Sequence, residues 1–329
     1  MLDIIVADIG GTHARFAIAT LSDCEPIQLK QAITLKTSDF NCLASAMRSY
    51  IRLSGGSSIQ DAAIAIAAPV SAGIYKLTNN TWCFDPSDFR NEFGLRHCLV
   101  INDFCAVAHA VGNAAPAALR QIFGPHSLPP ATGNLSVIGP GTGLGVAQLH
   151  RTHNSYIVIP TEGGRISFAP QDEVEDAIAS NLRKQYGRVS VERIVSGPGL
   201  MEIYSEIARA PDPRLIEDVD ALWRAGLCRS DETAETSLQR LCAIFGATCG
   251  DVALMHGSIA LVLTGRLCSM MLERLPETQF YNRFRSKGRY RDLMSQLSIY
   301  YFDHAQPGLV GAGWAFLKAR APSVTRPSQ

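Results

Sequence analysis

Four carboxylates stand beside glycines or at the expected end of a strand, where a side chain can reach a small ligand. They are Asp8 in "ADIGGTHARF", Asp103 in "INDFCAVAHAV", Glu162 in "PTEGGR" and Glu192 in "SVERIVSGPGL". A carboxylate can accept a proton, accept hydrogen bonds from hydroxyl groups or hold a hard cation such as Mg²⁺. Glu162 and Glu192 could equally be ordinary surface charges.

The residues around Asp8 predict a hairpin. Residues 3–7 and 15–21 are strand-like, so "DIGGTH" joins two strands. This position excludes a Walker A loop, which needs Gly-Lys-Ser/Thr before a helix. The turn is either an ordinary Gly-Gly turn or a loop that lets a ligand approach the backbone.

A second segment has the same pattern. "SVIGPGTGLGVAQL" (136–149) again predicts strand, Gly-Thr loop and strand, and aligning Thr12 with Thr142 places Gly11 on Gly141. Two such hairpins predict a duplicated architecture with one loop per domain. Backbone N–H groups and threonine hydroxyls of two such loops can clamp a polyphosphate.

Only the first of these loops carries a carboxylate in this alignment, because Asp8 falls on Ile138. That asymmetry suits a single Mg²⁺ held on one side through its water ligands.

Asp103 lies at a predicted strand-to-helix junction. "CLVINDFCAVAHAV" (98–111) reads as a strand that ends at Asn102 and Asp103, followed by a helix with an apolar stripe. Asp103 is then either the helix N-cap or a base facing a cleft, and the helix N-terminus favours its ionised form.

Glu162 is the better site candidate of the two glutamates, because its flanking glycines let a ligand come close. Glu192 precedes a Ser-Gly-Pro turn, in which Ser196 is expected to cap the next helix.

Seven motifs follow one another in the order found in bacterial ATP-dependent glucokinases: "DIGGTHARF", "LTNNTW", "INDFCAVAHAV", "GPGTGLGVA", "TEGG-ISFAP", "ERIVSGPGL" and "QPGLVGAG". The chain resembles this family from residue 3 to about residue 317. The resemblance implies an α/β fold of the actin/hexokinase-like (ribonuclease H-like) class, with two domains and an interdomain cleft that closes on the sugar.

The resemblance also implies roles for individual residues. Asp103 would accept the proton of the sugar 6-hydroxyl, while Asn102, Glu162, Arg165 and Glu192 would contact the sugar. Asp8 would position Mg²⁺ through water. The residues expected around the ATP phosphates are Ala7, Asp8, Ile9, Gly10, Gly11, Thr12, Gly141, Thr142, Gly143 and Gly265.

Two positions depart from the family pattern. Arg165 stands where the family usually has a sugar-contacting histidine, and Arg266 stands where a second glycine usually follows Gly265. Arginine is always charged, so Arg165 can pair with Glu162 or Glu192 and make the sugar compete with an ion pair. The alternative is that Arg165 points to solvent.

Composition excludes several other classes. Lys+Arg and Asp+Glu balance at 30 each, so no net field attracts nucleic acid or an anionic membrane. The basic run 283–291 is expected to be a solvated helix face or loop. Nine scattered cysteines without a C-x-x-C pair predict reduced thiols, and the apolar stretch 62–70 is too short to span a bilayer. We expect a cytoplasmic protein without a signal peptide.

The expected small domain runs from 1 to 112 and includes the returning segment 304–320. The large domain covers 113–303, and the tail 321–329 is expected to be disordered. Glucose is the expected substrate, with mannose or glucosamine as alternatives, and the family implies a homodimer. Two other readings stay open: a catalytically weak sugar-binding or regulatory protein, and an actin-like ATPase with a vestigial sugar site.

Overall fold

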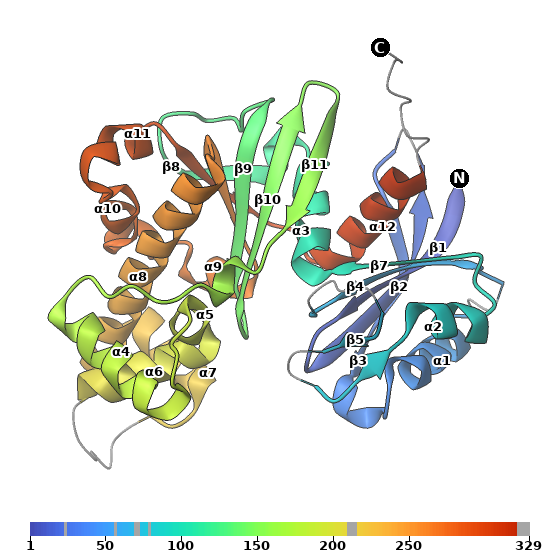
Figure 1. The fold of residues 1–329 in the computed structure, drawn as a ribbon, viewed down its shortest axis with the longest axis horizontal. Helices are drawn as coiled ribbons and strands as arrows, with labels where there is room; N and C mark the ends of the chain where they lie inside the picture. The colour runs from blue at the N-terminus through green and yellow to red at the C-terminus, as the bar shows by residue number, and fades with distance from the viewer. Residues whose placement is uncertain (23–24, 56–57, 69–72, 78–79, 209–215, 321–329) are drawn as a thin grey trace. The chain divides into compact units, whose positions relative to one another are not determined.

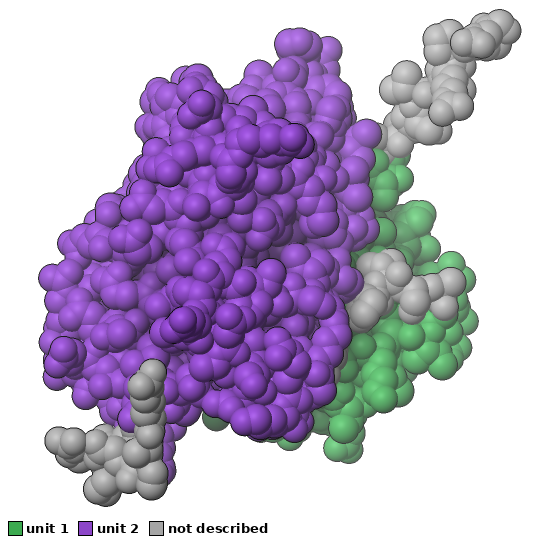
Figure 2. Space-filling view, turned by 60° about the vertical axis from the view of Figure 1, so that its left-hand side comes forward, with its two compact units in different colours: residues 1–114, 304–329 green, residues 115–303 purple. Residues whose placement is uncertain are grey.

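The computed structural model describes residues 1–22, 25–55, 58–68, 73–77, 80–208 and 216–320. The chain divides into two compact units, residues 1–114 with 304–329 and residues 115–303 (Figure 1), which are coloured separately in Figure 2. We call them unit 1 and unit 2. The expected disordered tail 321–329 lies outside the described residues.

Unit 1 is built around a five-stranded sheet. Its elements in chain order are β1 (Leu2–Ile9), β2 (His13–Leu21), β3 (Gln28–Lys36), α1 (Leu43–Ser54), β4 (Asp61–Ile66), β5 (Tyr75–Lys76), β6 (Cys83–Phe84), α2 (Pro86–Glu92), β7 (His97–Asn102), α3 (Asp103–Gly112) and α12 (Pro307–Arg320). The strand order is β3-β2-β1-β4-β7, with β4 and β7 parallel to β1.

Both faces of this sheet are covered, as the alternation in β1 shows. Ile5 and its alternate neighbours pack on the side of α1 and α2, where Phe16 stacks on Tyr50 at 5.2 Å between ring centroids. Ile4 and Val6 point to the other face, towards α3 and α12. A strand buried on both faces reads as a continuous apolar run, which is the pattern of β1.

Glycines allow α12 to lie close to its neighbours in unit 1. A Cβ on Gly311 would lie 1.7 Å from the carbonyl oxygen of Ala106 in α3, and one on Gly308 would lie 2.7 Å from Cγ of Asp8 in β1. The "QPGLVGAG" motif therefore packs the last helix against the strand and the helix that carry Asp8 and Asp103.

Unit 2 contains a six-stranded sheet and most of the helices. Its elements in chain order are β8 (Leu119–Phe123), β9 (Gly133–Pro140), β10 (Leu144–Thr152), β11 (Ser155–Pro160), α4 (Glu173–Tyr186), α5 (Val191–Ile194), α6 (Gly197–Ala208), α7 (Val219–Cys228), α8 (Glu232–His256), β12 (Ala260–Thr264), α9 (Arg266–Met271), α10 (Phe280–Arg285), α11 (Arg291–Ser295) and β13 (Ser298–Phe302). The strand order is β11-β10-β9-β12-β13-β8.

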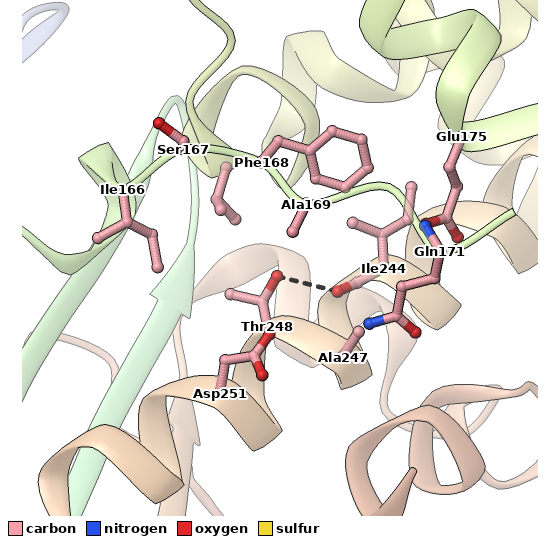
Figure 3. Close-up of a pocket in the computed structure, with 11 residues that line it drawn as sticks. Ile166, Ser167, Phe168, Ala169, Gln171, Glu175, Ile244, Ala247, Thr248 and Asp251 are labelled. Carbon is pink, nitrogen blue, oxygen red and sulfur yellow. Dashed lines mark hydrogen bonds between the residues drawn. The ribbon is translucent and has the colours of Figure 1, made fainter. Parts of the chain in front are cut away.

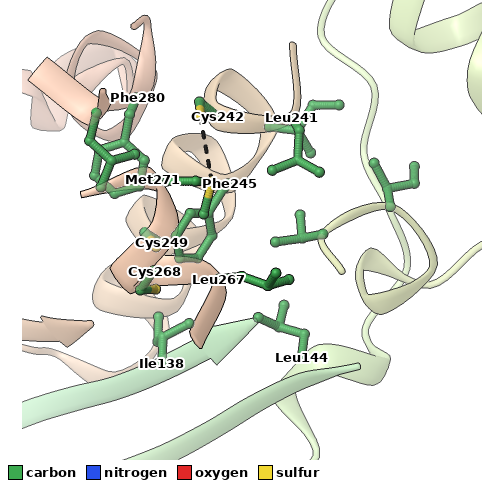
Figure 4. Close-up of a cluster of buried hydrophobic side chains, with 14 of the residues drawn as sticks. Ile138, Leu144, Leu241, Cys242, Phe245, Cys249, Leu267, Cys268, Met271 and Phe280 are labelled. Carbon is green, nitrogen blue, oxygen red and sulfur yellow. Dashed lines mark hydrogen bonds between the residues drawn. The ribbon is translucent and has the colours of Figure 1, made fainter. Parts of the chain in front are cut away.

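The core of unit 2 gathers around α8. Figure 4 shows Phe245 and Cys242 of this helix among side chains from β9, α9 and α10. A Cβ on Gly246 would lie 2.0 Å from the carbonyl oxygen of Phe280, so this glycine permits the close approach of α10. All eight cysteines in the described residues are free, and four of them are buried: Cys105, Cys242, Cys249 and Cys268.

One helix in the described residues, α8, is long and apolar enough to cross a membrane by length and composition. The sequence predicts a long buried helix over 236–257, and α8 confirms it. In the fold, 72% of its most apolar window is buried inside the protein, which is the position of a core helix.

The basic run 283–291 is only in part the solvated surface expected from the sequence: Arg289 and Arg291 are exposed, whereas the side chains of Arg283 and Lys287 are mostly buried. Arg283 and Arg240 both pair with Glu175, whose side chain is only 1% exposed. Lys287 is 7% exposed and pairs with Asp251 at 2.5 Å. Arg240 and Arg283 turn inward because the buried carboxylate of Glu175 needs partners, whereas Asp251, the partner of Lys287, is itself 52% exposed.

The two sheets share one design over five strands. The order β3-β2-β1-β4-β7 in unit 1 matches β11-β10-β9-β12-β13 in unit 2, with the same succession of antiparallel and parallel pairs. The predicted duplication and both predicted hairpins are therefore confirmed.

The two hairpin loops differ in length. Strands β1 and β2 pair as far as Ile9 and Ala14, which leaves residues 10–13 in the first loop. Strands β9 and β10 pair as far as Pro140 and Leu144, which leaves only residues 141–143 in the second.

This extra residue corrects the match that the sequence suggested for Asp8. Counted from the loops, the pair Asp8–Arg15 corresponds to the pair Gly139–Gly145, and not to Ile138. An ungapped alignment cannot detect the inserted residue, so it shifts the first strand by one position. The asymmetry itself remains, because Gly139 has no carboxylate either.

Candidate functional site

The first hairpin loop, residues 10–13, is a tight turn that directly follows the strand carrying Asp8. Gly10 donates its N–H to the carbonyl oxygen of His13 at 2.9 Å, which closes the turn. Asp8, at the end of β1, has a side chain that is 21% exposed, and Arg15 Nη1 lies 3.2 Å from its Oδ2. Burial raises the pKa of the Asp8 carboxyl, and the charge and hydrogen bond of Arg15 act against this rise.

Two residues that the sequence did not single out hold this loop. Thr37, which is buried, donates its hydroxyl to the carbonyl oxygen of Gly11 at 2.7 Å, and Asn80 donates its amide to the same oxygen at 3.1 Å. A pocket of about 450 Å³ opens beside the loop, lined by Gly11, Thr12, His13, Lys36, Thr37, Ser38 and Asn80. Asn80 belongs to the "LTNNTW" motif, whereas no local signal marks Thr37.

Asp103 is the first residue of α3, directly after β7. The helix cap is Asn102, whose side-chain oxygen accepts the N–H groups of Phe104 at 2.9 Å and Cys105 at 3.0 Å. The alternative in which Asp103 acts as the N-cap is therefore wrong. A carboxylate in the first turn of a helix is stabilised in its charged form.

The second hairpin loop contacts α5 and α6 of the same unit. Gly141 donates its N–H to the carbonyl oxygen of Gly143 at 2.7 Å and accepts the N–H of Gly197 at 2.8 Å. A Cβ on Gly143 would lie 2.4 Å from Oε2 of Glu192. The same carboxylate oxygen accepts the N–H of Leu144 at 3.2 Å, so Glu192 is bound to the end of this loop.

Arg165 lies between the two candidate glutamates. Its Nη1 is 3.4 Å from Oε1 of Glu192, and its Nε is 3.8 Å from Oε2 of Glu162. The side chains of Arg165, Glu162 and Glu192 are 46%, 52% and 26% exposed, so all three are accessible to a ligand from solvent. The expected pairing of Arg165 with these carboxylates is confirmed, and the alternative of an arginine that points away from them is not.

The glycines beside Glu162 let its turn pack closely on a strand. A Cβ on Gly164 would lie 2.1 Å from the carbonyl oxygen of Leu144, and one on Gly163 would lie 2.9 Å from Val146. Both contacts are with β10, so the Gly-Gly pair lets the Glu162 turn lie flat on that strand. The glycines are thus required by packing on β10, a role that the sequence did not indicate.

Gly265 has φ of +92°, a conformation that favours glycine, and directly precedes α9. Arg266, the first residue of that helix, is 78% exposed, and its nearest carboxylate is Asp220 at 3.8 Å. Ordered turns at strand or helix ends thus carry the candidate residues of both units: the two hairpin loops, Gly265 and the group of Glu162, Arg165 and Glu192.

A small cavity in unit 2 holds no room for a sugar or nucleotide. It measures about 30 Å³, enough for about one water molecule, and lies between residues 166–171 and α8 (Figure 3). Glu175 lines it, accepts the N–H of Gln171 at 2.9 Å and pairs with two arginines. The bonds of Glu175 beside this cavity hold the segment that follows Arg165.

No cluster of three or more His, Cys, Asp and Glu side chains suited to a metal ion occurs in the residues that the structure describes. A closed protein cage for a metal is therefore not formed by these residues. A lone carboxylate such as Asp8 fits only an ion that takes most of its ligands from water or from a substrate.

Three comparisons with known proteins give one answer. The family model described as Glucokinase matches residues 5–319. The glucokinase of Zymomonas mobilis is 42% identical over 317 residues, which cover 96% of this chain and 98% of that protein.

Two solved structures extend the likeness to the fold. A glucokinase from an Antarctic psychrotroph is 31% identical, with a TM-score of 0.80 and coverage of 97% of this chain and 99% of that one. A ROK family glucokinase from Streptomyces griseus, in complex with glucose and AMPPNP, is 16% identical, with a TM-score of 0.65 and coverage of 94% and 98%.

Proposed function

The chain belongs to the glucokinase family, and on this premise we propose that it transfers the γ-phosphoryl group of ATP to the 6-hydroxyl of glucose. The products are glucose 6-phosphate and ADP, and the reaction is the entry of glucose into glycolysis. Family membership makes the protein a sugar kinase; the assignment of glucose, of the individual residues and of Mg²⁺ is our proposal.

Asp103 is the general base in this proposal. It takes the proton from the 6-hydroxyl while the oxygen attacks the γ-phosphorus, which turns a poor nucleophile into a better one. The observation that carries this role is the division of labour at the start of α3: Asn102 caps the helix, and Asp103 beside it is held in the first turn. Asn102 also offers its amide to a sugar hydroxyl.

The backbones of Gly10–Thr12 and Gly141–Gly143 bind the ATP phosphates, with Ala7 and Ile9 as neighbours of the first loop and Gly265 near the nucleotide. Phosphoryl transfer needs orientation and charge stabilisation more than covalent help from the protein, and N–H groups of such turns supply both. The fixed geometry of the first loop, with Gly11 bonded to Thr37 and Asn80, supports this role.

Asp8 is the residue that would hold Mg²⁺, through the water ligands of the ion. Its carboxylate is a hard oxygen donor that remains partly exposed beside the first loop. When bound, Mg²⁺ would supply positive charge that neutralises the ATP phosphates.

Glu162 and Glu192 accept hydrogen bonds from the other sugar hydroxyls, because a carboxylate offers acceptors only. Both must share these acceptors with Arg165. This ion pairing is the observation that favours a second candidate function, a protein that binds sugar with little turnover or prefers another hexose such as mannose or glucosamine.

A coupled assay of ADP release, run with and without each sugar, tests these assignments. Sugar-dependent ADP release that is fastest with glucose supports the proposal. ADP release that is independent of sugar would point to an ATPase, and glucose binding without turnover would point to the second candidate. From the family we also expect a cytoplasmic protein that forms a homodimer. Analytical ultracentrifugation of the purified protein tests the oligomeric state.

A further inference from the structure

The group Glu162–Arg165–Glu192 in unit 2 carries a net charge of −1 when all three side chains are ionised. One guanidinium faces both carboxylates, at 3.4 Å from Glu192 and 3.8 Å from Glu162. The positive charge is closest to Glu192, which is the more buried of the two glutamates. Arg165 therefore halves the negative charge that an arriving sugar meets at these two carboxylates.

Resting on the glucose kinase function proposed above, we propose that Arg165 is a specificity-determining residue, which makes the site select neutral hexoses over hexoses that carry an ammonium group. A neutral sugar needs only acceptor sites for its hydroxyls, and because each carboxylate oxygen has two lone-pair sites, some remain for them beside the bonds to protein groups. An ammonium sugar gains in addition from uncompensated negative charge, and Arg165 removes part of that gain.

The backbone of Arg165 is held in its turn by hydrogen bonds on both sides. Its N–H is bonded to the carbonyl oxygen of Glu162 at 2.9 Å, and its carbonyl oxygen accepts a hydrogen bond from Arg188. The next residue, Ile166, accepts the N–H of Val191 at 2.9 Å, which ties the turn to the start of α5 beside Glu192. The backbone thus fixes the starting point of the guanidinium next to both carboxylates.

Glu192 has a second attachment that does not involve Arg165. Its Oε2 accepts the N–H of Leu144, while its Oε1 faces the guanidinium. Replacement of Arg165 therefore removes a charge while Glu192 stays bonded to the end of the second hairpin loop. This makes a substitution at Arg165 a test of charge rather than of local folding.

The size of the effect follows from the exposure of the group. All three side chains are partly exposed, so water and salt screen their charges, and one unit charge at this range changes a binding constant by about three- to tenfold. The effect must show as a change in the ratio of two affinities, because both sugars lose the same competitor for hydroxyl contacts when Arg165 is replaced.

The test compares Arg165→Gln with Arg165→Lys and Arg193→Gln. Arg193 is a matched control, since it neighbours Glu192 in the chain but its guanidinium lies 4.0 Å over the ring of Tyr186. Calorimetry measures the affinities of glucose and glucosamine for each nucleotide-free protein, at a pH where the glucosamine ammonium is protonated. Thermal unfolding confirms that each variant is folded.

We expect Arg165→Gln to shift the ratio of affinities about three- to tenfold towards glucosamine at low salt, and less at high salt. Arg165→Lys and Arg193→Gln should leave the ratio close to that of the unchanged protein. An unchanged ratio in Arg165→Gln, or an equal shift in Arg193→Gln, would overturn the proposal. Binding is measured without ATP, so this result does not depend on turnover, and failure of the kinase assay alone is a separate outcome.

Discussion

Unit 1 and unit 2 use the same five-stranded order but place charge differently at their hairpins. In unit 1 the second residue pair from the loop is Asp8–Arg15, and in unit 2 the corresponding pair is Gly139–Gly145. The second loop instead receives a carboxylate from another element, Glu192 in α5, which bonds to the backbone of Leu144. The duplicated scaffold thus fixes where a loop stands, while its charge is supplied separately in each unit.

The strand ends differ in the same way. Strand β7 of unit 1 corresponds to strand β13 of unit 2. When the registers of the two sheets are matched, Ile101 near the end of β7 corresponds to Phe302 at the end of β13. Beyond this point β7 passes through Asn102 directly into α3, which puts Asp103 in the first helical turn. After β13 the chain continues through Asp303 before α12 begins. Only the first of these ends couples a carboxylate to a helix N-terminus.

The largest expected effect is that of Asp103→Asn, which removes the carboxylate that distinguishes the end of β7 from the end of β13. Asp103→Asn should lower kcat for glucose by about 10²–10⁴, because the amide cannot accept the proton of the 6-hydroxyl. The fold should be retained, since Asn102 supplies the cap bonds. Steady-state kinetics with a thermal unfolding curve measure both effects.

Asp303→Asn is the matched control, because Asp303 is an exposed carboxylate that follows the corresponding strand. Its kcat should stay within about threefold of the unchanged enzyme, as for a surface substitution. If Asp103→Asn also stays within about threefold, Asp103 is not the base, and the difference between the strand ends has no catalytic meaning.

Local patterns were sufficient for the elements that carry the candidate residues. The Gly-Thr loops, the strand before Asp103 and the helix after Ser196 all depend on neighbours within a few residues, and the Ser196 hydroxyl does accept the N–H of Gly199 at 3.1 Å. The pairing of Arg165 with Glu162 follows from a separation of three residues in one turn.

Features that depend on distant segments were not predictable. Thr37 and Asn80 hold Gly11 from 26 and 69 residues away; Asn80 lies in the "LTNNTW" motif, but no local pattern indicates that either residue contacts Gly11. The one-residue difference between the hairpin loops and the packing of Gly164 on β10 also require the paired strands. Sequence patterns identify the turns, whereas tertiary contacts decide what each glycine and carboxylate touches.

The next largest effect concerns the carboxylate that only the first of the two hairpins carries. Asp8→Ala makes the first hairpin resemble the second, which has Gly139 at this position. We expect the KM for Mg-ATP to rise about ten- to a hundredfold, the order of one lost charge-assisted interaction, while glucose binding to the free protein stays nearly the same.

Asp3→Ala provides the control, since Asp3 lies on the same strand and accepts a hydrogen bond from Thr20 at 2.7 Å, away from the loop. Kinetics at varied Mg-ATP and calorimetry with glucose separate the two ligands. An equal loss of glucose binding in Asp8→Ala would show that Asp8 supports the sugar region and not the nucleotide.

The smallest effect compares two histidines, one in each unit. Burial lowers the pKa of His109 in α3 to about 4, with a further contribution from the charge of Lys318 in α12. Burial also lowers the pKa of His256 in α8, whose Nδ1 lies 2.8 Å from the hydroxyl of Ser136. Both are neutral in the folded protein near neutral pH.

A folded pKa below the ordinary value of 6.5 means that the unfolded chain takes up a proton first as the pH falls. The contribution of His109 is therefore complete above that value and is lost as the pH falls towards the folded pKa. We expect the free energy of unfolding to drop by about 1 kcal/mol between about pH 7 and about pH 5.5 on account of His109. Denaturant unfolding at several pH values should show this slope reduced in His109→Gln, and reduced less in His256→Gln because burial lowers the pKa of His256 less far. A slope that persists in His109→Gln would assign the acid sensitivity to other groups and would remove α3 and α12 as its origin.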